Sequence, residues 1–141
     1  MAEKDLWATL RDRMKLHGHF ERIENMVGRG RPDVNYCIQS SEGNIELKQI
    51  QNWPTRAETV VPIKHFTPQQ RIWIRQRCAA GGRVFVLLEV DRPIPCYFLL
   101  PGRWAWVELA KRATQDDVRR AAVATGIGSF PSAAVLAALT G

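Results

Sequence analysis

Three charged side chains in two neighbouring segments have the types and spacing expected of metal-assisted phosphate chemistry. Asp33 follows a proline, and Glu46 and Lys48 lie two positions apart within residues 45–50. If residues 45–50 form a strand, Glu46 and Lys48 project from one face, because alternate side chains point the same way. Carboxylate oxygens are ligands for Mg²⁺, and a lysine can position a water or neutralise charge on a phosphate. The pattern therefore indicates a site suited to phosphodiester hydrolysis.

An amphipathic helix is predicted before these residues, near the N-terminus. Within residues 3–17, Trp7, Leu10 and Met14 recur at helical spacing and form an apolar stripe. Glu3 falls on the same stripe in the first turn, where a carboxylate is also favourable because of the helix dipole. Glu3 is therefore either a site residue or an ordinary charge at a helix start.

Three short strands are predicted next, at residues 19–24, 34–38 and 45–50. Turn-forming residues separate them, which is typical of an antiparallel meander. The first turn contains Arg29 and Arg31 beside two glycines. Such a turn either holds a phosphate backbone or is a solvated hairpin tip. The same turn places the aspartate of the proposed site at the mouth of the second strand.

An irregular loop and a capped helix are predicted after the third strand. Prolines interrupt any regular element over residues 51–66. Trp53 in this loop either stacks on a nucleobase or pins the loop to the core. Residues 67–70 (Thr-Pro-Gln-Gln) have the pattern of a capping box, which predicts a helix reaching about residue 79. This helix is expected to bury part of Ile72.

The remainder of the chain predicts further strands and helices. Residues 84–90 form a continuous apolar run, as expected of a strand covered on both faces, and residues 96–100 form another strand. Helices are expected near residues 103–112, 115–125 and 131–139. The predicted fold class is therefore α/β, with a three-strand antiparallel meander, a crossover helix and further strands in a mixed central sheet. Helices flank this sheet, and a helical extension follows it.

Length, composition and charge are those of one globular domain. The chain has 141 residues, 45% of them hydrophobic, which is enough for a single core. We expect that core over about residues 3–100 and the helical extension over about residues 103–141. The formal charge of +6 favours a polyanionic partner such as nucleic acid.

The cysteines and the hydropathy pattern predict a cellular compartment. Three widely spaced cysteines indicate small buried side chains in a reducing environment. No apolar segment approaches the length of a membrane span. We therefore expect a cytoplasmic protein, in a bacterial cell or a phage-infected host.

The order of these motifs resembles the PD-(D/E)XK nuclease superfamily. The resemblance rests on the Pro-Asp pair, the Glu-x-Lys pair and the Thr-Pro-x-Gln helix start, and it covers about residues 3–90. Within the superfamily it points to the VRR-NUC and Holliday-junction-resolvase branch, including its small phage-encoded members. It implies a restriction-endonuclease-like core and hydrolysis of DNA to 5′-phosphate and 3′-hydroxyl products.

The resemblance also implies a metal site. Asp33 and Glu46 match the two metal-binding carboxylates of the superfamily, and the backbone carbonyl of Leu47 would be a further ligand. The bound ion would be Mg²⁺ or Mn²⁺. Either Glu3 or Glu24 would complete the acidic set, since one lies on the first helix and the other ends the first strand.

Further residues would act beside the metal or on DNA. Lys48 matches the motif lysine, and Gln70 matches the glutamine that these families carry at the start of the following helix. A basic surface would engage the DNA backbone. Its candidate residues are Arg29, Arg31, Lys64, Arg71 and Arg75.

Together these inferences predict a Mg²⁺-dependent DNA endonuclease selective for branched or junction DNA. A homodimer is expected with that activity, because resolving a four-way junction needs two symmetric cuts. The sequence leaves three alternatives open. These are another nuclease of the same fold (an exonuclease, nickase or flap endonuclease), a non-catalytic nucleic-acid-binding module, and an enzyme directed at RNA.

Overall fold

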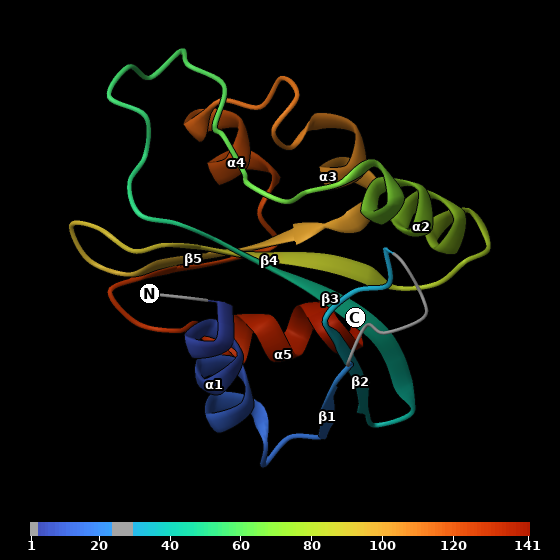
Figure 1. Ribbon diagram of the computed structural model, residues 1–141. Coiled ribbons are helices and arrows are strands. Elements are labelled where there is room, and N and C mark those ends of the chain that lie inside the picture. The colour runs from blue at the N-terminus through green and yellow to red at the C-terminus, as the bar shows by residue number, and fades with distance from the viewer. Residues whose placement is uncertain (1–2, 24–29) are drawn as a thin grey trace.

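The computed structural model describes residues 3–23 and 30–141, and its centre is a six-stranded mixed sheet (Figure 1). The strands are β1 (His19–Arg22), β2 (Val34–Ile38), β3 (Ser41–Ile50), β4 (Val84–Val90), β5 (Cys96–Pro101) and β6 (Ala124–Ile127). Their order across the sheet is the order of the chain. Every strand therefore pairs with its sequence neighbours.

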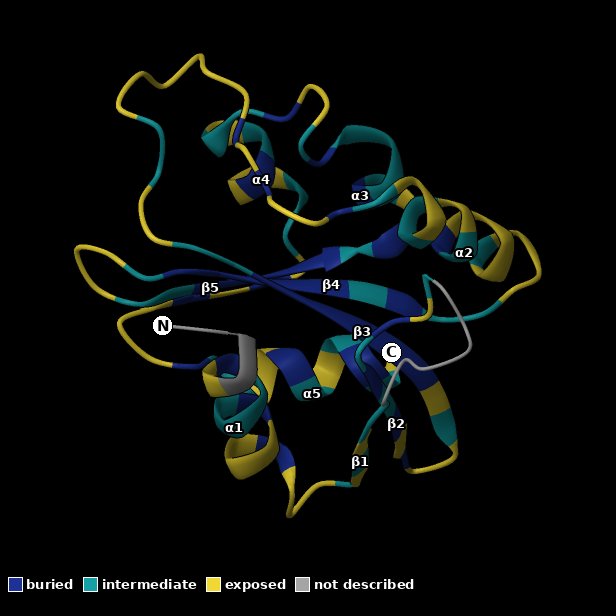
Figure 2. Ribbon diagram, viewed as in Figure 1, coloured by how far each residue is buried: buried dark blue, intermediate teal, exposed yellow. Residues whose placement is uncertain are grey.

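Helices cover both faces of the sheet. They are α1 (Glu3–Met14), α2 (Pro68–Ala79), α3 (Gly102–Glu108), α4 (Gln115–Ala121) and α5 (Ser132–Thr140). The first and last helices, α1 and α5, lie against one face, and α2, α3 and α4 lie against the other (Figure 1). The strands between these layers are largely buried (Figure 2).

Strand pairing confirms the predicted mixed sheet. The first three strands, β1 to β3, form an antiparallel meander, and β4 to β6 also pair antiparallel. The central pair, β3 and β4, is parallel. A parallel pair needs a crossover connection, which the loop at residues 51–66 and α2 provide.

Each central strand sends alternate side chains into the two cores. On β4, Val86 and Leu88 pack in the core beneath α2, α3 and α4, whereas Leu87 packs in the core above α1 and α5. The apolar run of β4 follows from this, since both of its faces are covered. On β3, Ile45 and Leu47 enter the α1–α5 core. Their alternates, including Glu46 and Lys48, consequently face the α2 side.

The segment after β5 differs from the prediction. A helix was expected over residues 115–125, but α4 ends at Ala121 and residues 124–127 form the edge strand β6. The C-cap residue Ala122 already has an extended backbone, with φ −63° and ψ 131°. The following Thr-Gly pair has low helix propensity, and pairing with β5 satisfies its backbone instead.

Smaller corrections concern a turn and two side chains. Residues 41–44 were expected in a turn, but they begin β3, and the turn is at Gln39 and Ser40, which both have positive φ. Cys37 is exposed rather than buried, because it alternates with the inward residues of β2. Ile72, expected to be partly buried on α2, is 47% exposed.

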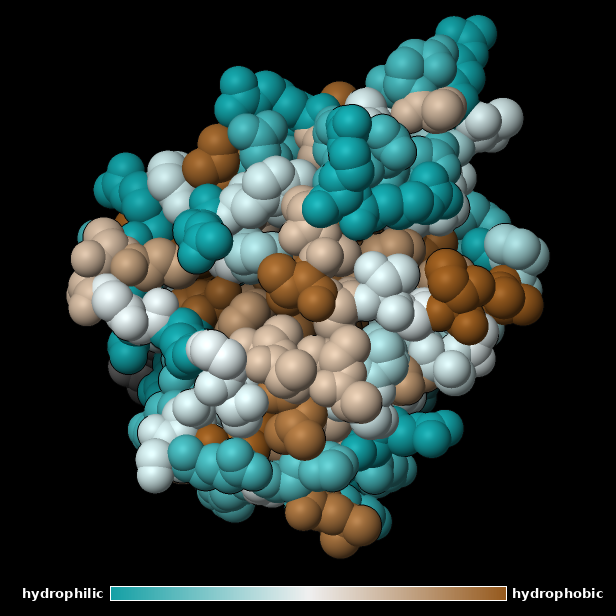
Figure 3. All heavy atoms as spheres, turned by 180° about the vertical axis from the view of Figure 1, so that it is seen from behind, coloured by the Kyte–Doolittle hydropathy of each residue, from teal (hydrophilic) through white to brown (hydrophobic). Residues whose placement is uncertain are grey.

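The surface is mixed in character. Seen from behind, hydrophilic residues surround a paler, more apolar area near the middle of the face (Figure 3). In the part of the chain that the structure describes, no helix combines the length and apolarity needed to cross a membrane.

A buried tyrosine provides a test of how α5 docks. The hydroxyl of Tyr36 donates a 3.1 Å hydrogen bond to the Leu139 carbonyl. Burial raises the pKa of Tyr36 from 10.0 to about 12. We expect Tyr36→Phe to lower the free energy of unfolding by about 1 kcal/mol at neutral pH, because a buried carbonyl loses its donor.

The pH dependence of that difference has a defined sign. The unfolded tyrosine ionises at a lower pH than the folded one, so the contribution of Tyr36 to stability, which only wild type has, is lost as pH rises from about 10 towards about 12. Urea titrations of both proteins should therefore show the advantage of wild type shrinking over this range. An unchanged difference at high pH would contradict a protonated, hydrogen-bonded Tyr36 in the fold.

Candidate active site

The strand register brings Asp33 beside Glu46. Val34, the first residue of β2, pairs with Ile45 of β3, so the residues just beyond this pair are Asp33 and Glu46. The ladder ends there, and the Leu47 N–H donates a 2.8 Å hydrogen bond to Asp33 Oδ2. The aspartate thus replaces a strand partner and is fixed against β3.

Glu46 and Lys48 form a buried ion pair on the α2 face of β3. The Lys48 Nζ lies 3.2 Å from Glu46 Oε2, and each side chain is 2% exposed. The ammonium also donates a 2.9 Å hydrogen bond to the His65 carbonyl. The Phe66 ring lies below it, with its centroid 5.6 Å from Nζ. These contacts hold the lysine in one position at the end of the 51–66 loop.

Gln70 connects the start of α2 to both members of the ion pair. Its Nε2 donates to Glu46 Oε2 at 3.1 Å, and its Oε1 accepts from Lys48 Nζ at 3.3 Å. The predicted capping box with Thr67 is confirmed, because Gln70 Oε1 also accepts from the Thr67 N–H and the Thr67 hydroxyl accepts from the Gln70 N–H. One side chain therefore caps a helix and orients two charged groups.

The two carboxylates carry more negative charge than the site neutralises. Burial raises the pKa of Glu46 well above its usual value, and the neighbouring Asp33 carboxyl raises it further, while Lys48 acts in the opposite direction. Glu46 Oε1 is a buried oxygen without a hydrogen-bond partner among the described residues. A buried acceptor in this state is costly unless a proton or a cation joins it.

Hard divalent cations suit this donor set. Mg²⁺ takes oxygen ligands and is commonly held by one or two protein carboxylates together with water or substrate phosphate. Asp33 and Glu46 provide two such carboxylates, and the orphaned Oε1 is available to an ion. Among the described residues, no cluster of three or more His, Cys, Asp or Glu side chains is placed to hold a metal.

Several predicted site residues fall outside the described part of the chain. Glu24 and Arg29 lie in the undescribed segment 24–29, and Glu3 begins α1 but its side chain is not described. Their assignments stay predictions.

The predicted DNA-contacting residues are distributed around the site. Arg31, Lys64 and Arg75 are exposed. The exposed Lys64 lines a hollow beside the end of β3, together with Gln49. All three therefore have the accessibility that a phosphate contact requires.

Arg71 differs from the prediction because it is partly buried. Its guanidinium donates to the carbonyls of Trp106 at 2.9 Å and Leu109 at 2.6 Å. It also lies over the Phe66 ring, with Cζ 4.2 Å from the centroid. Burial lowers the pKa of this group. Arg71 thus ties α2 to α3, and its contact with DNA stays a prediction.

The sequence did not reveal the part played by the 51–66 loop. Lys48 is bound by the backbone carbonyl of His65, whose φ of +63° is unusual for a non-glycine residue. A backbone contact leaves no pattern in the sequence, although a loop of this length is itself a functional signal. The ring of Trp53 packs edge-on against Phe98 at 5.4 Å, which favours its role in pinning the loop.

These elements define a restriction-endonuclease-like α/β fold, with the charged cluster on the central strand beneath the crossover helix. A solved structure with this fold is Hjc, a Holliday junction resolvase from the archaeal hyperthermophile Archaeoglobus fulgidus. It superimposes with a TM-score of 0.55 over 94% of this chain and 97% of its own, at 14% sequence identity. The similarity is therefore one of fold, and it extends well beyond residues 3–90. No family model matches the chain, and none of the curated proteins matches it in sequence.

Gly30 provides a test of whether the turn before Asp33 packs against the start of α2. Its φ is +82°, and a Cβ built there would lie 2.3 Å from the Gln69 carbonyl oxygen and 2.9 Å from the Gln70 nitrogen. We expect Gly30→Ala to lower the free energy of unfolding by at least about 1 kcal/mol, because both the backbone angle and the contact are unfavourable.

Thermal unfolding measures this effect, and Gly81→Ala is the matched control. Gly81 also has a positive φ, but a Cβ there meets nothing within 4 Å. Both variants place an alanine at a positive φ, so they share the backbone strain. A larger loss of stability in Gly30→Ala than in Gly81→Ala therefore measures the contact with α2. Equal losses would show that the turn does not press against the helix.

Proposed function

We propose that this protein is a Mg²⁺-dependent DNA endonuclease that hydrolyses phosphodiester bonds in branched DNA such as a four-way junction. The single observation that carries the proposal is the cluster of Asp33, Glu46 and Lys48, in which two adjacent carboxylates and a fixed ammonium share a buried site. The fold shared with a solved Holliday junction resolvase supports it. Membership of the VRR-NUC or phage-type branch is part of the same proposal.

The chain offers three oxygen ligands for the ion. These are Asp33, Glu46 through the orphaned Oε1, and the Leu47 carbonyl. In a strand the N–H and C=O of one residue point to the same side, so the Leu47 carbonyl lies on the side where its N–H meets Asp33. Glu3 or Glu24 is proposed as the remaining acidic ligand. When bound, Mg²⁺ (or Mn²⁺) would activate a water and stabilise the leaving oxygen.

Lys48 is proposed to stabilise charge on the scissile phosphate or to position the attacking water. Its ammonium is held beside the carboxylates by Glu46, His65 and Gln70, so its charge is already positioned at the site. Because these three contacts use all three of its N–H donors, a direct bond to water or phosphate would replace one of them. Gln70 acts as a positioning residue, since it contacts both the glutamate and the lysine.

DNA would be bound mainly through its backbone. Exposed Arg31, Lys64 and Arg75, together with Arg29, are proposed to contact phosphates, consistent with the formal charge of +6. Binding through phosphates selects DNA by shape rather than by base sequence. A homodimer in the cytoplasm of a bacterium or an infected host completes the proposal, because a junction is cut symmetrically.

Cleavage assays with site variants test the chemistry. We expect Asp33→Asn and Lys48→Ala each to lower the cleavage rate at least about 100-fold, since the first removes a charged metal ligand and the second removes the positive charge proposed to act on the phosphate or the attacking water. The substrates are a labelled four-way junction, a flap and a linear duplex, each with Mg²⁺ and with EDTA. Variants that cut as fast as wild type would refute the site, and equal rates on the junction and the duplex would refute junction selectivity.

Thermal unfolding tests metal binding without relying on activity. Asn at position 33 can still accept the Leu47 N–H, so Asp33→Asn should keep the fold and, in EDTA, be at least as stable as wild type because carboxylate repulsion is relieved. Added Mg²⁺ should raise the melting temperature of wild type and not that of the variant.

Asp116→Asn is the control for this comparison, because Asp116 is an exposed carboxylate on α4. It should keep the Mg²⁺-dependent increase in melting temperature. If Asp33→Asn keeps the same increase, the ion binds elsewhere.

A further inference from the structure

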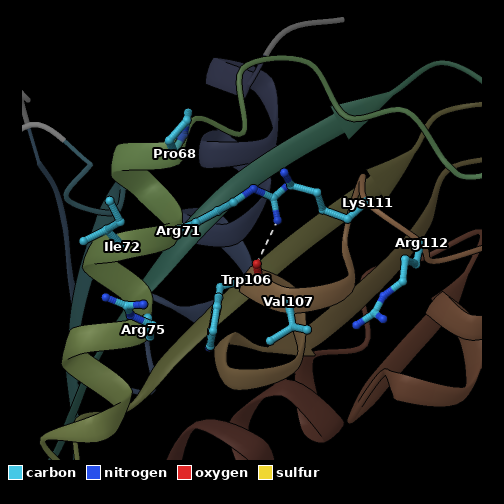
Figure 4. A pocket seen from close by; sticks show the side chains of 8 residues that line it. All are labelled: Pro68, Arg71, Ile72, Arg75, Trp106, Val107, Lys111 and Arg112. Carbon is cyan, nitrogen blue, oxygen red and sulfur yellow. Dashed lines mark hydrogen bonds between the residues drawn. The ribbon is translucent and has the colours of Figure 1, made fainter.

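A groove of about 500 Å³ lies between α2 and α3 (Figure 4). Its walls are largely apolar and include Ile72, Trp106 and Val107. The volume falls within the range of small-molecule sites, which combine apolar walls with a few polar groups. Ile72 is 47% exposed here, and an exposed apolar residue beside a partly exposed tryptophan is a surface that a planar apolar ligand could cover.

The rim of the groove is basic. Arg75, Lys111 and Arg112 line it, and no acidic side chain of the described residues does. Arg112 is paired with Glu108 at 2.9 Å, so the charge offered to a ligand comes mainly from Arg75 and Lys111. The Arg75 guanidinium lies over the Trp106 ring, with Cζ 5.9 Å from the centroid. The groove thus pairs an aromatic surface with cations, which is the combination that binds single-stranded nucleic acid.

The groove adjoins the charged cluster. Arg71 lines the groove, and its Cζ lies 4.2 Å from the Phe66 centroid, while Lys48 Nζ lies 5.6 Å from the same centroid. The two cations are therefore no farther apart than the sum of these distances. One strand of a duplex advances about 3.4 Å per nucleotide, so the near wall of the groove is within a few nucleotides of the site.

We propose that this groove binds an unpaired base of the substrate strand, stacked on Trp106, with the adjoining phosphate held by Arg75 and Lys111. The proposal rests on the nuclease function proposed above and adds a substrate feature to it, namely unpaired nucleotides close to the cleaved bond. A stacked base suits the apolar walls, and its phosphate suits the rim. Because any base can stack on an aromatic ring, the groove would select single-stranded nucleotides without selecting a base sequence.

Binding to an overhang with and without bases tests the groove. The probe is a dye-labelled duplex with a short single-stranded overhang, whose unpaired nucleotides are either normal or abasic. Both probes keep the same phosphates, so only the bases differ. Fluorescence anisotropy in EDTA measures affinity without cleavage. We expect wild type to bind the normal overhang about 5- to 100-fold more tightly than the abasic one.

Variants at the stacking position should remove that preference. Trp106→Ala should bind both overhangs equally, whereas Trp106→Phe should keep a preference. Trp104→Ala is the matched control, because Trp104 lies on the same helix at similar burial and lines a different hollow. Ile72→Glu places a negative charge at an exposed groove position, and it should weaken binding to the normal overhang more than binding to the abasic one. It provides the same test if the Trp106 variant fails to fold.

Charge variants test the phosphate contact. Arg75→Ala should weaken binding to both the normal and the abasic overhang, and it should reduce the salt dependence of the affinity by about one released counterion. Arg77→Ala should change neither, because Arg77 lies over Trp73 on the same helix and outside the groove. Both arginines lie on α2, but only Arg75 lines the groove.

Two results would overturn the proposal. One is equal affinity of wild type for the normal and abasic overhangs. The other is an unchanged preference in both Trp106→Ala and Ile72→Glu, as expected if the groove instead binds a protein segment. Binding is measured without metal, so its outcome is independent of cleavage. Tighter binding of the normal overhang without Mg²⁺-dependent cleavage would support the proposed base-binding groove and refute the nuclease function. Mg²⁺-dependent cleavage with equal affinity for the two overhangs would support the nuclease function and refute the base-binding groove.

Discussion

The burial of the Glu46–Lys48 ion pair on β3, beside the Asp33 carboxylate, is the constraint on which the rest of the site depends. Glu46 and Lys48 are each 2% exposed, and buried charges are destabilising unless they are paired and hydrogen-bonded. The partners come from separated parts of the chain: Asp33 before β2, His65 at the end of a long loop, and Gln70 at the start of α2. Folding must therefore bring together all of these segments before the charges are satisfied. Within residues 3–23 and 30–141, Glu46 Oε1 still has no hydrogen-bond partner. A buried acceptor of this kind is better explained by ligand binding than by a contribution to stability.

The helix that crosses over the sheet does more than connect β3 to β4. Its capping box uses the side-chain oxygen of Gln70 to accept from the Thr67 N–H, and the same side-chain amide contacts both members of the ion pair. Local helix stability and site geometry are thus coupled through one glutamine. Gly30 approaches the first turn of this helix so closely that no larger residue fits without displacement. The turn before Asp33 and the start of α2 are consequently held in one arrangement.

The C-terminal third of the chain is more than a peripheral addition. It provides the edge strand β6, and α5 packs with α1 on the face opposite the charged cluster. On the other face, α3 and α4 cover the α2 core, and Arg71 bonds two carbonyls at α3 and the residue after it. This arginine, the Phe66 ring and Lys48 form a continuous contact from the groove to the cluster. A ligand in the groove would therefore lie against the same rigid framework that holds the charges.

The sequence by itself determined the elements whose signals are local. Turn-forming residues delimited β2, a continuous apolar run placed β4, and the Thr-Pro-x-Gln start placed α2 and its cap. The Glu-x-Lys spacing put two charges on one strand face. Only the tertiary structure decided which distant groups meet them. The approach of Asp33 follows from strand register, the His65 carbonyl is a backbone group that no residue type marks, and the burial of Arg71 depends on carbonyls in another element. The strand β6 escaped prediction for the same reason, because Ala-Thr-Gly-Ile becomes a strand only where β5 offers it an unpaired edge.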